Sequence, residues 1–160
     1  MTEAREATDA DVAELVRIIN RAYGVEAYFK TGDRTDATEV RALLAQDTFL
    51  VLDQTPSAPA GGALMAGVHV ALRGERGYFG MLSVDPEVQG RGLARRLIAA
   101  AEACARGRGC RAMDIHVLSL RTELPPLYRK FGYEVTGTRP FQTSFRLGYE
   151  SHLVVMSKPL

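Results

Sequence analysis

The fold is decided by the stretch Leu82-Ser83-Val84-Asp85-Pro86-Glu87-Val88-Gln89-Gly90-Arg91-Gly92-Leu93-Ala94-Arg95-Arg96. It predicts a strand that passes through a proline turn into a glycine-rich loop, which opens a helix. Glycine lets the backbone approach a ligand closely. The first amides of a helix have no internal carbonyl partners and carry the positive end of the helix dipole. The stretch therefore predicts a cradle for an anion such as a pyrophosphate.

Two other phosphate-binding loops fit this stretch less well. A nucleotide P-loop needs Gly-Lys-Ser/Thr at the helix start, and this chain has Gly92-Leu93-Ala94 there. A dinucleotide fingerprint needs a third glycine three residues after the second, where this chain has Arg95, and a parallel strand-helix-strand context. The P-loop is therefore excluded, and the dinucleotide fold is disfavoured.

Hydrophobic periodicity extends the pattern in both directions. Before the loop it predicts a helix over 9–23, a short helix over 38–46, and an antiparallel meander of three strands over 49–52, 63–72 and 78–84. After it come a helix over 92–106, a strand over 112–118, a helix over 125–131, and strands over 133–139 and 150–156. This order predicts an α+β fold with a mixed sheet.

Composition narrows the class of protein. The chain is 46% hydrophobic and 24% charged, which predicts one globular domain over 1–160. Twenty Lys and Arg against 19 Asp and Glu leave a net charge of +1, too balanced for a main role on nucleic acid or an anionic membrane. No apolar run is long enough to span a bilayer, and the start lacks the apolar region of a signal peptide, so we expect a cytoplasmic protein.

The three histidines, His69, His116 and His152, lie far apart in the sequence, which argues against a structural zinc site.

Two motifs carry a resemblance to a known family. Val84-Asp85-Pro86 followed by Gln89-x-x-Gly92-x-Ala94 resembles the acyl-coenzyme A signature of the GNAT superfamily of N-acyltransferases. The segment 127–133, Leu-Tyr-Arg-Lys-Phe-Gly-Tyr, is similar to that family's second motif. The resemblance implies a central mixed β-sheet of about six to seven strands flanked by about four helices. It also implies acetyl-CoA as co-substrate and no metal.

The same resemblance assigns a binding site residue by residue. It implies that the strand backbone pairs with the pantetheine arm of the coenzyme through Leu82, Ser83 and Val84. It also implies that the pyrophosphate is held by the loop residues Gln89, Gly90, Arg91, Gly92, Leu93, Ala94 and Arg95. Many relatives carry an asparagine six residues before the leucine of the second motif. This chain has Arg121 there, and we expect the arginine to reach the cofactor in its place.

Family chemistry implies direct attack of an amine on the thioester in a ternary complex. Tyr128 is the predicted acid for the leaving thiolate, and the backbone N–H of Leu82 is the predicted oxyanion donor. Relatives often place a base at positions that align with Tyr78 and Gly80, and neither residue is an evident base. Glu26, in the loop after the first helix, is the best remaining carboxylate, with a water relay as the alternative.

Two of the histidines, His69 and His116, lie in predicted strands. A lone strand histidine is more often part of a structural hydrogen bond than a catalyst, so we expect both to be structural.

The leading hypothesis is an N-acetyltransferase that moves an acetyl group from acetyl-CoA to the primary amine of a small metabolite, amino acid or drug-like compound. The alternatives are a non-catalytic acyl-CoA sensor and a protein N-terminal or lysine acetyltransferase. Homodimers are frequent in the family, although no feature of this sequence fixes the oligomeric state.

Overall fold

One mixed sheet organises the molecule, and the computed structural model describes residues 3–28, 32–141 and 151–160. Within those ranges the sheet has seven strands in the order β1-β2-β3-β4-β5-β7-β6. Their bounds are β1 Arg5–Glu6, β2 Thr48–Asp53, β3 Leu64–Arg73, β4 Arg76–Val84, β5 Ala112–Leu118, β6 Glu134–Pro140 and β7 His152–Pro159. Strands β2, β3 and β4 form the predicted antiparallel meander.

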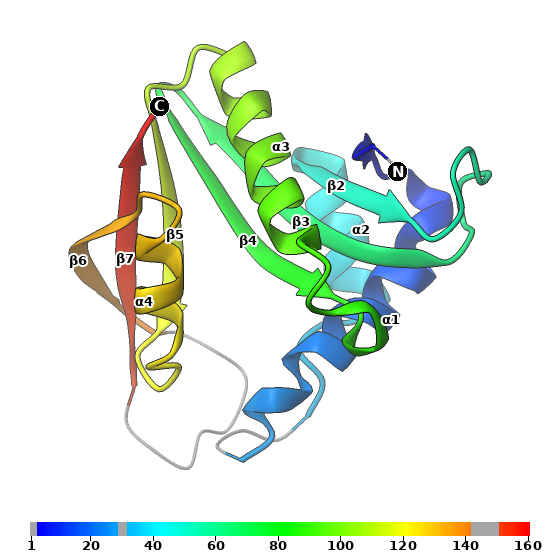
Figure 1. Ribbon diagram of the computed structural model, residues 1–160, viewed down its shortest axis with the longest axis horizontal. Helices are drawn as coiled ribbons and strands as arrows, with labels where there is room; N and C mark the ends of the chain where they lie inside the picture. Colours follow the sequence, from blue (N-terminus) through cyan, green and yellow to red (C-terminus); the bar gives the residue numbers. More distant parts are fainter. Residues whose placement is uncertain (1–2, 29–31, 142–150) are drawn as a thin grey trace.

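Helices cover both faces of the sheet (Figure 1). Helices α1 (Val12–Ala22) and α2 (Ala37–Gln46) pack on one face, and α3 (Leu93–Gly107) and α4 (Leu124–Arg129) lie on the other. Three short 3-10 turns join these elements: η1 Asp9–Asp11, η2 Tyr23–Glu26 and η3 Pro86–Val88. None of the described helices combines the length and apolar character needed to cross a membrane.

The predicted fold class is confirmed, with element ends displaced by a few residues. The largest displacement is in the last strand, which ends at Pro159 rather than at residue 156; its predicted start, Glu150, lies outside the described residues. Strand β1 was not predicted because two residues are too few to show a period of two. Its pairing with β2 depends on tertiary contacts.

The sheet opens in its middle. Strand β4 runs parallel to β5 through three residue pairs, Arg76 with Ala112, Gly77 with Met113 and Tyr78 with Asp114. Within the described chain, the pairing ends there, and Figure 1 shows the two strands diverging from the end of the sheet near the C-terminus. Beyond Tyr78 the backbone edge of β4 therefore has no strand partner on the β5 side among the described residues.

A buried polar cluster joins α3 to the two strands at the far edge of the sheet. The carboxylate of Glu102 on α3 accepts hydrogen bonds from the Tyr133 hydroxyl at 2.9 Å and from Lys158 Nζ on β7 at 3.0 Å. Glu102 is 5% exposed, and Arg106 Nη2 lies 3.7 Å from its other carboxylate oxygen, so the three groups together offset the cost of its burial. The cluster therefore holds the β5, β7 and β6 part of the sheet against the helix that starts at the glycine loop.

Replacing Lys158 with Met should destabilise the protein, because the Glu102 carboxylate loses its main counter-charge. Loss of one partner from a fully buried pair costs about 3–5 kcal/mol, and we expect about 2–3 kcal/mol here because Lys158 is partly exposed. Denaturant unfolding followed by circular dichroism measures the change. Lys130→Met, at an exposed position, is the control and should leave the unfolding free energy unchanged. Equal unfolding midpoints for the two variants would show that the cluster contributes no stability.

Candidate active site

The glycine loop places a set of free backbone donors beside the opening. Gly90 and Gly92 have φ values of 81° and 74°, in the left-handed region that favours glycine, and α3 begins at the next residue, Leu93. Among the described residues, no backbone or side-chain acceptor takes a hydrogen bond from the N–H groups of residues 89–95. Unpartnered amides at a helix start can bind an anion, and the pyrophosphate cradle at these residues stays a prediction.

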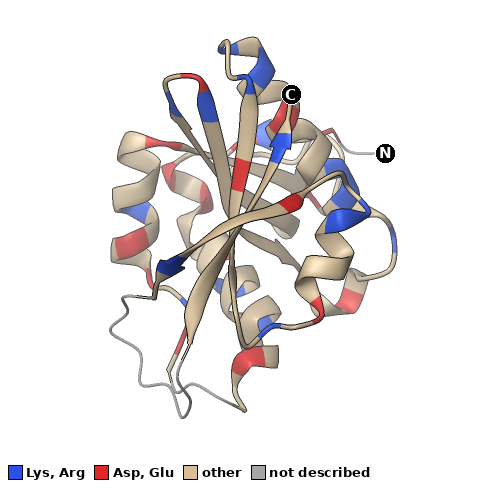
Figure 2. Cartoon of the chain, turned by 90° about the vertical axis from the view of Figure 1, so that its left-hand side faces the viewer, with Lys and Arg blue, Asp and Glu red and all other residues tan. Residues whose placement is uncertain are grey.

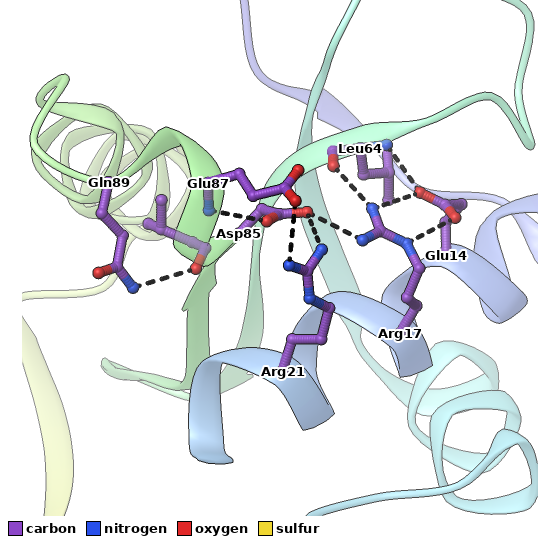
Figure 3. A network of polar contacts seen from close by, with 8 residues as sticks. Glu14, Arg17, Arg21, Leu64, Asp85, Glu87 and Gln89 are labelled. Atoms are coloured by element: carbon purple, nitrogen blue, oxygen red, sulfur yellow. Dashed lines mark hydrogen bonds and ion pairs between the residues drawn. The ribbon is translucent and has the colours of Figure 1, made fainter. Parts of the chain in front are cut away.

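An ionic anchor ties this loop to α1 (Figure 3). The Asp85 carboxylate accepts hydrogen bonds from Arg17 Nη1 at 2.9 Å, from Arg21 Nη1 at 3.1 Å and from the backbone N–H of Glu87 at 3.0 Å. Arg17 also binds Glu14, one turn earlier on the same helix. The pKa of Asp85 lies below its usual value: burial raises it, but the hydrogen bonds and charges of the arginines and the Glu87 amide outweigh burial.

The sequence analysis did not find this anchor. The feature of the sequence that indicates the anchor is the spacing of Arg17 and Arg21. They are one helical turn apart on α1, so their side chains lie on the same face of the helix. Their partner, the aspartate of the Val-Asp-Pro turn, lies 64 residues or more along the chain. The turn residue Asp85 therefore both caps η3 and fixes the loop to the opposite layer of the fold.

The strand residues predicted to meet the pantetheine arm begin within a bulge in β4. Met81 has a φ of 50°, and the register places Met81 and Leu82 opposite Val68 alone. A bulge disrupts the ladder locally and re-aims the peptide groups around it. Beyond it, Ser83 is buried and donates its hydroxyl hydrogen to the Met81 carbonyl at 2.9 Å. The bulge thus lies on the strand that borders the opening.

Tyr128 lies on α4 with its ring in the core beneath α3. Its ring centroid is 6.1 Å from that of Phe79 and 6.2 Å from that of Tyr133. The residue is 9% exposed, and within the described chain its hydroxyl makes no hydrogen bond. Burial, followed by the Tyr23 charge, raises the pKa of Tyr128 well above its usual value, so the phenol stays protonated. A buried, protonated hydroxyl without a described partner is suited to donate to a ligand.

The structure brings together two residues that the sequence assigned to different roles. The Arg121 guanidinium donates from Nη1 to Glu26 Oε2 at 2.8 Å and from Nε to Glu123 Oε1 at 2.5 Å. Glu26 lies in η2 and is 6% exposed, and Arg121 lies in the loop between β5 and α4. The Tyr28 hydroxyl donates to the Leu120 carbonyl across the same boundary at 3.3 Å. These contacts join the segment after α1 to the loop after β5.

A sheet that opens beside a helix start with unpartnered amides is the arrangement that the sequence resemblance implies for acyl-coenzyme A-dependent acyltransferases. Residues 12–133 match the model of the acetyltransferase (GNAT) family. That match covers more than half of the chain, and the protein belongs to the acetyltransferase (GNAT) family.

Individual relatives agree with this family. The acetyltransferase YE1169 of Yersinia enterocolitica is 33% identical over 81 residues, which span 51% of this chain and 57% of that relative. The ribosomal-protein-S18-alanine N-acetyltransferase of Escherichia coli has a similar fold, with a TM-score of 0.77 at 16% identity over 99% of this chain and 94% of that one. YncA of Salmonella typhimurium, solved with its cofactor acetyl-CoA, also has a similar fold. Its TM-score is 0.70 at 24% identity, over 100% of this chain and 94% of that one.

The residues of this chain fit acetyl-CoA, the co-substrate of the family. The free amides of residues 89–95 match a pyrophosphate, and the exposed guanidinium groups of Arg91 and Arg95 can add positive charge beside it. Arg95 also lies over the Phe131 ring at 5.1 Å, which holds its side chain close to the helix start. The buried hydroxyl of Tyr128 is a further donor that has no hydrogen-bond partner among the described residues.

Replacing Asp85 with Asn should weaken acetyl-CoA binding. The change keeps the size of the side chain but removes the charge that binds Arg17 and Arg21, so the loop amides lose their anchor. A lost charge-assisted hydrogen bond costs about 1.5–3 kcal/mol, and we expect the Kd to rise about 10-fold or more. Isothermal titration calorimetry measures it. Glu87→Gln, whose exposed carboxylate lies 3.6 Å from Arg21, is the matched control. Equal Kd values for the two variants would exclude the anchoring role.

Proposed function

We propose that this protein transfers the acetyl group of acetyl-CoA to a primary amine by direct attack in a ternary complex. The single observation that carries the proposal is the free set of amides at the start of α3, beside the opening between β4 and β5. The loop amides hold the pyrophosphate, and Leu82, Ser83 and Val84 guide the pantetheine arm along β4. The thioester then lies in the opening, where a second substrate can reach it.

Within this proposal, the Leu82 N–H stabilises the oxyanion that forms on the thioester carbonyl, because the bulge re-aims the peptide groups around it. Tyr128 donates to the sulfur as negative charge develops there. A phenol of raised pKa is a weaker acid than a thiol, whose ordinary pKa is ~8.5. Tyr128 therefore gives up its proton only as it receives another, from the attacking nitrogen. Its role is to pass a proton and to stabilise the leaving group.

Charge distribution favours a small acceptor. Figure 2, viewed from the β6 side, shows basic and acidic segments interspersed over several elements rather than gathered on one of them. A polypeptide acceptor rich in one charge needs a complementary surface of some size. We therefore favour a small amine over a protein N-terminus or lysine. The cytoplasmic location and the homodimer remain predictions from the sequence.

The wild-type protein should release CoA from acetyl-CoA in the presence of at least one primary amine. A thiol reagent measures the release against a panel of amino acids, polyamines, drug-like amines and short peptides with free N-termini or lysines. A small amine should give the highest kcat/KM. A protein that binds acetyl-CoA by calorimetry but releases no thiol with any acceptor would be a sensor. Faster turnover with a peptide than with every small amine would instead favour a protein acetyltransferase.

Tyr128→Phe should lower kcat by about 10²-fold or more, because general acid catalysis contributes about 10²–10⁴-fold. The Kd for acetyl-CoA should stay unchanged, since the pyrophosphate and pantetheine contacts do not involve this hydroxyl. Tyr133→Phe is the matched control: that hydroxyl binds Glu102 in the core, so its loss should lower stability and leave kcat intact. Full turnover by Tyr128→Phe would refute the role in proton transfer.

A further inference from the structure

The narrow end of the opening holds two aromatic side chains to which the sequence analysis gave no catalytic role. Tyr78 is the last residue of β4 that pairs with β5, and His116 lies two residues beyond the last paired residue of β5, Asp114. The ring centroids of Tyr78 and His116 are 4.9 Å apart. The two rings therefore bridge the strands at the point where they begin to diverge.

His116 faces the side of the sheet that carries α1 and α2. Its neighbours Ile115 and Val117 belong to the core beneath α3, and side chains along a strand alternate between faces. Within the described chain, neither imidazole nitrogen of His116 makes a hydrogen bond, and the side chain is partly exposed. The imidazole is thus free to exchange a proton with a molecule in the opening.

The other strand histidine is different. His69 on β3 is 7% exposed, and its Nε2 lies 3.0 Å from a carboxylate oxygen of Asp47. Asp47 also binds Arg73. The structural role predicted for His69 is confirmed, because its Nε2 is engaged in a buried hydrogen bond with Asp47. The same prediction is not met at His116.

Gly80 leaves the space that the Tyr78 hydroxyl occupies beside β4. A Cβ atom at position 80 would be 2.5 Å from the Tyr78 hydroxyl oxygen, so the phenol lies over the bare backbone of its own strand. Position 80 immediately precedes the bulge at Met81 and Leu82. Tyr78 therefore extends along β4 towards the proposed oxyanion donor, with His116 beside its ring.

Charges from several elements set the protonation of this pair. Burial is the main cause that lowers the pKa of His116 below 6.5; Arg139 on β6 lowers it further, and Asp114 on its own strand opposes them. Asp114 is itself paired with Arg76 on β4 and accepts a hydrogen bond from Ser157 on β7. Burial raises the pKa of Tyr78 to about 12, with a smaller contribution from Tyr23 and an opposing one from Arg34. At pH 7 the imidazole is neutral and the phenol is protonated.

We propose that His116 accepts the proton of the substrate ammonium group, with Tyr78 as the residue that positions it. The inference rests on the proposed function, and it assigns the proton to His116 rather than to Glu26, whose carboxylate is paired with Arg121. The first ammonium proton goes to the imidazole. The freed nitrogen forms the C–N bond, the C–S bond breaks, and the second proton leaves the nitrogen and reaches the sulfur through Tyr128. His116 returns its proton to solvent, so one proton is released per turnover.

The test compares His116→Gln with the wild type across pH 6–10, using acetyl-CoA and the best amine of the panel. Near pH 7, where the amine is an ammonium ion, kcat/KM should fall about 10²-fold or more. The two profiles should converge above the pKa of the amine, because a free amine needs no base for its first proton. The Kd for acetyl-CoA should not change. His152→Gln, at an exposed histidine on β7, is the matched control and should follow the wild type.

Glu26→Gln is the competing variant in the same experiment. If it shows the loss at neutral pH and the recovery at high pH, while His116→Gln follows the wild type, the base is Glu26 and the inference is overturned. Equal profiles for both variants and the wild type overturn it as well, and leave the proposed function standing. A wild type that releases no CoA with any amine refutes the proposed function, and the role of His116 with it.

Discussion

The early end of the pairing between β4 and β5 is the constraint on which the rest of the structure depends. Parallel neighbours inside a sheet normally satisfy each other's peptide groups, and a buried group left unsatisfied costs about 1–3 kcal/mol. Here three residue pairs hold the strands together, and the remaining edge of β4 faces the opening. That edge is stable only if water or an extended ligand supplies the missing partners. The unpaired edge of β4 is therefore the place where the proposed function puts the pantetheine arm, as an extended ligand that supplies those partners.

The opening can persist because each half of the sheet is fastened to helices by its own contacts. On the β4 side, the Asp85 anchor joins the glycine loop to α1. On the β5 side, Glu102 joins α3 to Tyr133 and Lys158. Helix α3 takes part in both halves, since it starts at the loop and carries Glu102. The position of the amides at its first turn is thus set by the Asp85 anchor before the helix and by the Glu102 contacts further along it, which preorganises them for an anion.

Local sequence patterns predicted the helices, strands and glycine loop, but they did not predict the tertiary contacts between them. Periodicity located α1 and α3, and Gly90 and Gly92 marked the loop, because these properties depend on neighbours in the chain. The ion pair between Glu26 and Arg121 joins residues 95 positions apart, and the approach of His116 to Tyr78 depends on where β5 leaves β4. No local pattern encodes such distances. Glu26 and Arg121 were consequently assigned separate roles, and His116 was expected to be structural.

The geometry also separates the two proton-handling groups of the proposed reaction. Tyr128 lies in the core under α3 and α4, and His116 lies on the face of α1 and α2. A sheet paired along its whole length would isolate these side chains from each other. The opening is the route by which one substrate nitrogen can meet an acceptor on one face while the departing sulfur meets a donor on the other. In the proposed reaction, the nitrogen gives its first proton to His116 on one face and its second to Tyr128 on the other, and the break in hydrogen bonding between β4 and β5 is what lets one substrate meet both groups.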